Sequence, residues 1–565
     1  MLDRLETIPA DSLESDLLDF KLWENSKNSL KVAVEYAVCF ANSKGGALVF
    51  GINDKVIGRG NAVQGVGHFC LDQWKQAIFN DTRPHIHAEL AELNVPEGTG
   101  KLLVVRVLKG NDPPYGTSAG LFKVRVAKSC MPLDPTEFAR MQVRSGVVDW
   151  SAEPAQNVTF AELDAVEIAR GRNFLRRYQP DSPLLSAQIS DQKFLESLGV
   201  VSTGRVTNAG LLLFGRQDII REIMPQHQVH YVHLSSPMQA ARNASWTDGL
   251  LAIIERLEAV FEGPTNPEYE LSFGFTKIRI PAFPVDVVRE AVLNALTHRD
   301  YLSPNEVLIR HANTQLAVTS PGGFLGGITP SNILRQEPFA RNRRLAEAFE
   351  KLRLVERAGM GRSRIFIPML RYGKRIPEYE SNGERVTLRL FDGSVDERMA
   401  KLVAKWSKEG RDLWLDSLLI LTYMQNHQYI ATPEATNLLQ TSQREALDIL
   451  ESHSMPPLSI LERVGRSKPA KYHLTRGVAR DLVGRAIYTH ARSIDPDRDK
   501  EAIRNYVQDH GSINNSELRE LLGLGGSGSA KVESSRLLAK YSGESGFLEK
   551  FGPTNKPRYR LKADS

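Results

Sequence analysis

The sequence predicts a multidomain protein of α/β and α+β architecture that ends in two copies of a small helical module. Its 565 residues are too many for one hydrophobic core, because a domain usually holds roughly 150 residues. Residues 10–150 alternate between helical and strand-like hydrophobic patterns, and the C-terminal part contains an internal repeat. We therefore expect five domains, at residues 1–150, 151–284, 285–398, 399–485 and 490–565.

The composition is that of an ordinary globular protein: 41% hydrophobic and 25% charged residues argue against extensive disorder. No apolar run reaches the ~18 residues of a membrane span, and the N-terminus lacks the basic and apolar regions of a signal peptide. We therefore expect a cytoplasmic protein with no membrane partner.

The net charge of +5 permits an anionic partner without requiring one. The three cysteines form no Cys-x-x-Cys pattern, so structural zinc is not expected, and Cys39 is expected to be a buried small apolar residue.

The individual elements are predicted from the spacing of apolar residues and from the turn residues between them. In the N-terminal part, the pattern indicates a helix at Val32–Ala41, strands at Ala47–Ile52 and Leu102–Leu108, and a hairpin that includes Leu121–Val126. In the middle part, the expected strands are Gly210–Gly215, Gln228–Leu234, Glu306–His311 and Gln315–Thr319, and the expected helices are Trp246–Phe261 and Val285–His298.

The internal repeat aligns Leu461–Leu474 with Leu548–Leu561 without gaps, with Leu, Glu, Gly, Tyr and Leu identical and two basic positions retained. Each copy follows three short amphipathic segments. These are Trp414–Asn426, Pro433–Gln440 and Ser442–Ser452 in the first copy, and Lys500–His510, Asn515–Leu522 and Lys531–Tyr541 in the second. Three helices followed by a hairpin with a basic tip are typical of a winged helix-turn-helix, so we expect two of them.

A cluster of charged residues near the N-terminus has the chemistry of a phosphodiesterase site. Asp19 and Lys21 share one face of an extended segment, Glu14 precedes them, and Asp54 follows a glycine-closed strand. Carboxylate oxygens around Mg²⁺ or Mn²⁺, with a cation for the phosphate, are what metal-dependent cleavage of nucleic acid needs. A solvated charged edge would have a similar pattern, and so would a surface that binds nucleic acid without cleaving it.

Residues 12–138 resemble the Schlafen-type AlbA-like domain in three separated blocks. The blocks are Glu14-x4-Asp19-Phe20-Lys21, Cys39-Phe40-Ala41-Asn42-Ser43-Lys44-Gly45-Gly46 and Gly51-Ile52-Asn53-Asp54. The resemblance implies that Glu14, Asp19 and Asp54 hold Mg²⁺ or Mn²⁺ and that Lys21 contacts a phosphate. Asp19 stands where the family usually has Glu, and Asn53 where it has Asp. A later family block reads Arg125-Val-Ala-Lys128 here, and Arg125 and Lys128 are candidate nucleic-acid contacts.

A second candidate site lies on the predicted helix Val285–His298, where Glu290, Asn294 and His298 recur every four residues on one face. This region resembles a divergent GHKL-like ATPase domain, which implies that Glu290 polarises water, that Asn294 coordinates Mg²⁺ and that ATP is the ligand. The resemblance places Gly322 and Gly323 in the adenine-binding turn, which here lacks the usual Asp. It places Gly359 and Gly361 in the glycine-rich lid, whose backbone N–H groups can cradle phosphate. A ligand-sensing or purely structural remnant of such a domain is the alternative.

The C-terminal repeats supply basic residues that suit phosphate contacts with DNA or RNA. The candidates are Arg444, Lys468 and Lys471 in the first copy and Lys531, Arg536, Lys556 and Arg558 in the second. Winged helices also serve as protein-docking or dimerisation modules.

Two functions follow from these patterns. The first is a metal-dependent Schlafen-like ribonuclease of bacterial defence or stress, acting on tRNA or another structured RNA. The second is a non-catalytic, DNA-binding transcriptional regulator, to which the ATPase-like resemblance would add a response to ATP. A homodimer or higher oligomer is implied by the two resemblances.

Overall fold

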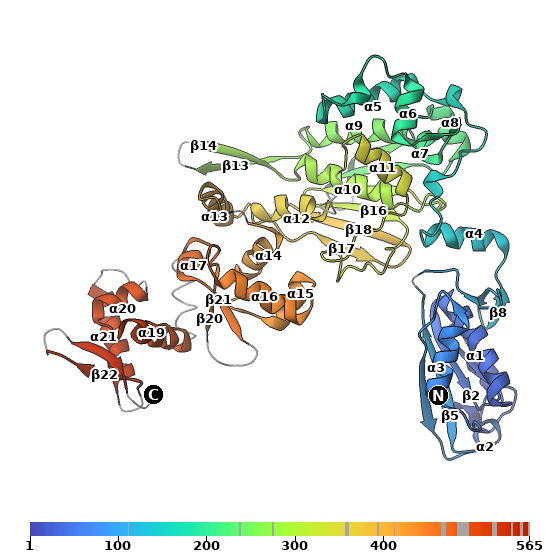
Figure 1. Ribbon diagram of the computed structural model, residues 1–565, viewed down its shortest axis with the longest axis horizontal. Coiled ribbons are helices and arrows are strands. Elements are labelled where there is room, and N and C mark those ends of the chain that lie inside the picture. Colours follow the sequence, from blue (N-terminus) through green and yellow to red (C-terminus); the bar gives the residue numbers. More distant parts are fainter. Residues whose placement is uncertain are drawn as a thin grey trace.

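The structure is a computed structural model of the chain. It describes residues 1–565 except 111, 237–238, 274–275, 356–360, 393–394, 412, 465–469, 483–495, 523–527, 544–545, 554–556 and 563–565. Figure 1 shows an N-terminal α/β domain, a larger middle part built on a sheet, and two small helical units that follow it. The short helix α4 (Pro135–Arg144) connects the first domain to the middle part.

The N-terminal domain is a four-stranded sheet in the order β1-β2-β5-β4, in which β1 and β2 are parallel. Its main elements are β1 (Leu18–Lys21), α1 (Ser26–Ala41), β2 (Gly45–Phe50), α3 (Leu71–Asn80), β4 (Glu89–Asn94), β5 (Lys101–Leu108) and the hairpin β7–β8 (Lys123–Val126 and Ser129–Pro132). The predicted helix and strands of this part are confirmed. Helices α1 and α3 cover one face of the sheet with a core that includes Phe40, Trp74 and Val105. Phe20 packs into a separate core on the opposite side.

The middle part contains one six-stranded sheet in the order β12-β11-β15-β16-β18-β17. Its strands are β11 (Val229–Ser236), β12 (Gln239–Trp246), β15 (Val307–Ala312), β16 (Gln315–Pro321), β17 (Glu378–Ser381) and β18 (Arg385–Phe391). Its helices are α5 (Ala165–Tyr178), α6 (Asp191–Leu198), α7 (Asn208–Phe214), α8 (Gln217–Ile223), α9 (Leu250–Phe261), α10 (Val285–His298), α11 (Arg343–Lys351) and α12 (Gly361–Arg371), and the ribbon β13–β14 (Glu268–Phe273 and Thr276–Pro281) extends from it. Because β11 pairs in parallel with β15, the expected domain boundary between residues 284 and 285 does not separate two folding units.

The expected strand at Gly210–Gly215 is wrong, because this segment lies in the helix α7. Thr207 caps the helix by accepting a hydrogen bond from the backbone N–H of Gly210, at 3.1 Å. Every residue of α7 is buried. A short apolar run that is buried on all sides has the same sequence pattern in a helix and in a strand, so periodicity alone does not distinguish them.

The C-terminal part contains the two expected sets of three helices and a hairpin. The first follows α13 (Glu397–Lys408) and comprises α14 (Leu415–Met424), α15 (Thr432–Leu439), α16 (Gln443–Ser454) and the strands β19 (Ile430–Ala431), β20 (Leu461–Val464) and β21 (Lys471–Leu474), with α17 (Arg476–Leu482) after them. The second comprises α19 (Pro496–His510), α20 (Asn515–Leu521), α21 (Gly528–Ser542), β22 (Leu548–Phe551) and β23 (Arg558–Leu561). The hairpins pair in equivalent register, Leu461 with Leu474 and Leu548 with Leu561, so the sequence repeat is also a structural repeat. Within the part of the chain that the structure describes, no helix is both long and apolar enough to cross a membrane.

Candidate functional site

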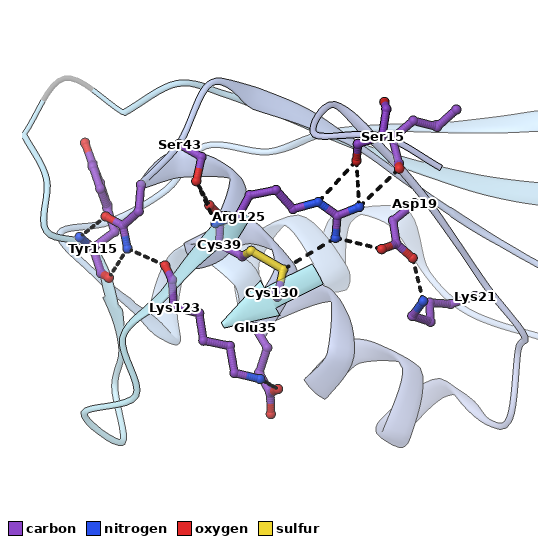
Figure 2. Close-up of a disulfide and its surroundings, with 12 residues drawn as sticks. Ser15, Asp19, Lys21, Glu35, Cys39, Ser43, Tyr115, Lys123, Arg125 and Cys130 are labelled. Atoms are coloured by element: carbon purple, nitrogen blue, oxygen red, sulfur yellow. Dashed lines mark hydrogen bonds and ion pairs between the residues drawn. A yellow bond between two sulfur atoms is a disulfide. The ribbon is translucent and has the colours of Figure 1, made fainter. Parts of the chain in front are cut away.

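The strand β1 positions the predicted N-terminal cluster. Side chains alternate along a strand, so Phe20 points into one core while Asp19 and Lys21 point together toward α1, as the sequence predicts. Asp19 is only 1% exposed, and both of its carboxylate oxygens face a cation. Oδ1 lies 2.5 Å from the Lys21 Nζ, and Oδ2 lies 2.7 Å from the Arg125 Nη1 (Figure 2).

Arg125 is a buried structural cation in this site. Its side chain donates to the backbone oxygens of Ser15 (2.8 Å) and Leu18 (3.2 Å) as well as to Asp19, and its own N–H donates to the Ser43 hydroxyl (Figure 2). It is therefore not on the surface, where a nucleic-acid contact was expected. Lys128 remains at the surface, half-exposed, in an ion pair with Asp11 at 2.6 Å.

A disulfide between Cys39 and Cys130 holds the hairpin that carries Arg125 against α1 (Figure 2). Cys39 is fully buried, as expected, but it is disulfide-bonded, which the sequence did not predict. The cysteines are 91 residues apart, and neither lies in a spacing pattern that would have paired them. The Arg125 Nη1 lies 3.8 Å from the Cys130 Sγ, so the disulfide adjoins the charged cluster.

The Asn-x-x-Gly-Gly block at the end of α1 is a structural clamp. The Asn42 side chain donates to the backbone oxygens of Tyr115 (2.8 Å) and Lys123 (2.9 Å) and accepts from the Tyr115 N–H (2.6 Å). A Cβ on Gly46 would lie 2.5 Å from the Phe40 ring, which explains the need for glycine where β2 starts. The block thus joins α1, β2 and the segment that leads to Arg125.

Glu14 lies beside Asp19 and Lys21, whereas Asp54 follows β2 and its backbone carbonyl accepts the Asp11 N–H at 2.8 Å. The Glu14 Oε1 accepts the Phe20 N–H at 3.3 Å and lies 3.9 Å from the Lys21 Nζ. Burial and the neighbouring Asp19 raise the pKa of Glu14 to about 7. Across the described ranges, no three His, Cys, Asp or Glu side chains are grouped to hold a metal ion. Lys21 and Arg125 thus neutralise the charge of Asp19, and within the described ranges no group of three metal ligands stands beside it.

The predicted residues of the second site line one cavity of about 450 Å³ in the middle part. The predicted set found there is Glu290, Asn294, His298, Gly322, Gly323 and Gly361. Helix α10 supplies the first three, the turn after β16 the next two, and the start of α12 the last. Gly359 falls in 356–360, outside the described residues.

The floor of this cavity is built from α10 and the start of α12. The Asn294 side chain donates to the Glu290 Oε1 at 3.2 Å, and Glu290 is 3% exposed. A Cβ on Gly361 would lie 2.4 Å from the same Glu290 oxygen, so no larger residue fits there without displacing it. Burial and the neighbouring Arg341 lower the pKa of His298 to about 4, so its imidazole is neutral at physiological pH.

Other residues near the cavity hold it in shape. Arg341 donates to the backbone oxygens of His298 (3.0 Å) and Gly323 (2.9 Å), and so joins α10 to the glycine turn. Arg299 is fully buried and donates to backbone oxygens that include that of Gln226 (2.6 Å), so it is structural. The Ser320 hydroxyl donates to the Ala295 carbonyl at 2.7 Å. Ser320 stands at the position where a GHKL domain has the Asp that binds adenine. Sequence reasoning missed Arg341, which is distant in sequence from the helix that it supports.

The C-terminal basic residues have different surroundings. Arg444, Lys531 and Arg536 are exposed on α16 and α21. Lys471 lies over the Tyr429 ring at 4.3 Å, and Arg558 pairs with Glu517 at 3.0 Å. Lys468 and Lys556 lie outside the described residues.

The fold and these two sites define a multidomain protein with an N-terminal α/β domain and an ATPase-like middle domain. Residues 14–134 match the family "Schlafen, AlbA_2", and residues 305–390 match the family described as "Putative ATP-dependent DNA helicase recG C-terminal". The chain therefore carries a Schlafen AlbA_2 domain followed by an ATPase-like domain, as the sequence resemblances imply. The AlbA_2 domain implies nucleic-acid binding. Residues 139–230 match a domain of unknown function, DUF8451.

Among solved structures, the chain is similar to the DIP2311 protein from Corynebacterium diphtheriae. The two are 23% identical, with a TM-score of 0.51 over 83% of this chain and 93% of that one. This likeness supports the fold alone. No curated protein sequence matches the chain.

Proposed function

We propose that this protein is a non-cleaving, DNA-binding transcriptional regulator whose C-terminal repeats are winged helix-turn-helix modules and whose middle cavity binds ATP. The non-cleaving part of the proposal rests on Asp19. This buried carboxylate has each of its two oxygens paired with a cation, Lys21 on one and Arg125 on the other. A nuclease metal at this carboxylate would have to compete with Lys21 and Arg125 for the lone pairs of its oxygens.

ATP is the ligand that we assign to the middle cavity. Its volume of about 450 Å³ lies within the usual range of small-molecule sites, roughly 300–1,000 Å³. Asn294 offers an amide oxygen to the metal of a Mg²⁺–nucleotide, Glu290 lies beside it, and Gly361 leaves space that a side chain would fill. Bound nucleotide would add the negative charge of its triphosphate to the cavity, so the regulator would exist in a nucleotide-bound and a nucleotide-free state.

The proposal is tested by measuring binding and cleavage with the same preparation. Full-length protein is titrated into labelled duplex DNA and tRNA by fluorescence anisotropy, and the nucleic acids are then examined on denaturing gels after incubation with Mn²⁺. We expect binding without cleavage, together with saturable binding of a fluorescent ATP analogue that Asn294→Ala weakens. Cleavage that Asp19→Asn abolishes would overturn the non-cleaving assignment.

A metal-dependent Schlafen-like ribonuclease is the second candidate, and Glu14 favours it. A carboxyl with a pKa of about 7 beside Lys21 has the property of a general acid–base group at neutral pH. This candidate requires tRNA cleavage that Mn²⁺ supports, that rises with pH through about 7 and that Glu14→Gln abolishes. Intact tRNA over this pH range would remove it.

A further inference from the structure

The two C-terminal repeats differ in their relation to the rest of the molecule. The core of the first repeat, with Leu418 and Leu450, is continuous with the core of the middle part. The second repeat has a core of its own around Ile503, Leu518 and Leu538. The first repeat is therefore built into the middle part, whereas the second packs as a separate unit (Figure 1).

A loop of the middle part covers the turn between α15 and α16 in the first repeat. Gln440 in this turn donates from Nε2 to the Pro330 carbonyl and accepts at Oε1 from the Leu334 N–H, both at 2.9 Å. Its backbone has a φ of +52°, the left-handed conformation that is common where a helix ends, here at the C-cap of α15. In a helix-turn-helix, this turn and the start of the next helix approach the DNA. Here the loop contacts the turn at Gln440, while the start of α16 stays exposed.

The same loop contacts two more elements of the first repeat. Arg335 donates from Nε to the Leu439 carbonyl at 2.9 Å, and its Nη2 lies 2.6 Å from Asp416 at the start of α14. Ile328 and Ile333 of this loop line the middle cavity. Through these contacts the first repeat binds the loop that forms one wall of the cavity.

The outward helices of the two repeats also differ in charge. On α16, one exposed cation, Arg444, stands among three acidic residues: Glu445, Asp448 and Glu451. On α21, three exposed cations stand with one exposed acid: Lys531, Arg536 and Lys540 with Glu533. Because DNA carries a dense negative charge, α16 repels it and α21 attracts it.

We propose that the first repeat is a docking module for the cavity wall, and that the second repeat binds duplex DNA through α21. The proposal rests on the proposed function, because it assigns the nucleic-acid binding to one repeat. Arg536 and Lys540 lie four residues apart on one face of α21, an arrangement that suits the major groove of B-form DNA. The major groove of duplex RNA is too deep and narrow for such a helix, so DNA is the partner.

The binding half is tested by anisotropy titrations of the full-length protein with duplex DNA over a series of salt concentrations. Arg536→Ala with Lys540→Ala is expected to weaken binding and to reduce the slope of log K against log salt by about two, since each phosphate contact contributes about one. Arg444→Ala on α16 is the matched control and is expected to bind as the wild type does. A wild-type slope in the α21 variant, an equal loss in the control, or tighter binding to duplex RNA would overturn this half.

The docking half is tested by hydrogen exchange of the full-length protein without nucleic acid. Gln440→Ala with Arg335→Ala is expected to speed amide exchange in α15 and α16 and to leave α1 unchanged. Gln443→Ala, exposed on α16 just beyond the turn, is the matched control. Unchanged exchange in the double variant overturns the docking role.

If the wild type binds neither nucleic acid, the proposed function and the binding half both fail, and exchange still decides the docking half. If DNA binds but the α21 variant is unaffected, only the inference fails.

Discussion

Asp19 sets the electrostatic character of the N-terminal site. A carboxylate there is one methylene shorter than the Glu usual in the family, and the buried Arg125 guanidinium reaches it directly. With Lys21 on its other oxygen, Asp19 is neutralised inside the protein and contributes to the stability of the domain. The pair with Arg125 links β1 to β7, which lie 106 residues apart in the chain.

Removing the guanidinium should therefore destabilise the fold. We expect Arg125→Gln to lower the free energy of unfolding by about 3–5 kcal/mol, because the substitution leaves Asp19 charged, buried and short of one partner. Urea denaturation followed by circular dichroism measures the change. Lys128→Gln, which removes a surface ion pair of the same hairpin, is the control and should have no measurable effect. Equal losses in the two variants would contradict the structural role of Arg125.

The raised pKa of Glu14 predicts a pH dependence of stability. The folded protein holds a proton on Glu14 up to about pH 7, whereas an unfolded chain releases it near pH 4.5, so stability falls as pH rises through this window. Glu14→Gln removes the titration. We expect the variant to gain stability relative to the wild type as pH rises from 4.5 to 7, measured by urea denaturation at each pH. A constant difference between the two proteins would show that Glu14 titrates normally.

At the scale of single elements, the hairpin β7–β8 depends on a covalent bond as well as on Arg125. The Cys39–Cys130 disulfide closes a long loop, and such cross-links contribute about 4–5 kcal/mol by limiting the unfolded chain. We expect Cys130→Ser to lose an amount of this order in non-reducing buffer, measured by urea denaturation. Dithiothreitol should bring the wild type to the same value. Cys70→Ser, at an exposed free cysteine, should change nothing. A wild type that is insensitive to reductant would contradict the cross-link.

The first residue of α12 has an equally specific requirement. Gly361→Ala would place a methyl group 2.4 Å from the Glu290 Oε1, and must push this side chain into the cavity. We expect at least about a tenfold loss in affinity for a fluorescent ATP analogue, equivalent to about 1.4 kcal/mol, measured by equilibrium titration. Gly477→Ala in α17 is the control, because a Cβ there meets nothing within 4 Å. Retained affinity in the Gly361 variant would place the ligand elsewhere.

The elements that sequence reasoning predicted best are those with a clear period or a clear boundary. Helix α10 begins and ends where the spacing of apolar residues predicts, and β15 and β16 follow it as expected. The failures have physical causes that a local pattern does not contain. The helix α7 is buried on all sides, and the pairing of β11 with β15 joins residues 78 apart, such as Val229 and Val307, across an expected domain boundary. The Arg125–Asp19 and Cys39–Cys130 contacts join residues 106 and 91 apart within the first domain.

For the whole molecule, the loop at residues 323–341 is the point where three parts meet. Its Leu325 and Phe339 line the cavity and also lie against Gly146, just after α4. Arg341 at its end bonds to the Arg144 carbonyl of α4, and Arg335 bonds to the first repeat. The cavity wall is thus attached to the connection with the N-terminal domain on one side and to the helical repeats on the other.

Because one loop makes all of these contacts, a ligand that moves it should change DNA binding. Allosteric coupling is commonly 5- to 150-fold, and we expect a non-hydrolysable ATP analogue with Mg²⁺ to shift the affinity for duplex DNA by about tenfold. Arg335→Ala should abolish the shift while retaining nucleotide affinity, because it frees the loop from Asp416 without touching the cavity floor. Arg389→Ala, which removes a surface ion pair with Glu380 on the sheet, is the control and should keep the shift. The measurement is a DNA titration with and without nucleotide for each protein.

An equal shift in the wild type and in Arg335→Ala would mean that the coupling does not depend on this loop. No shift in the wild type would mean that the cavity and the DNA-binding surface act independently.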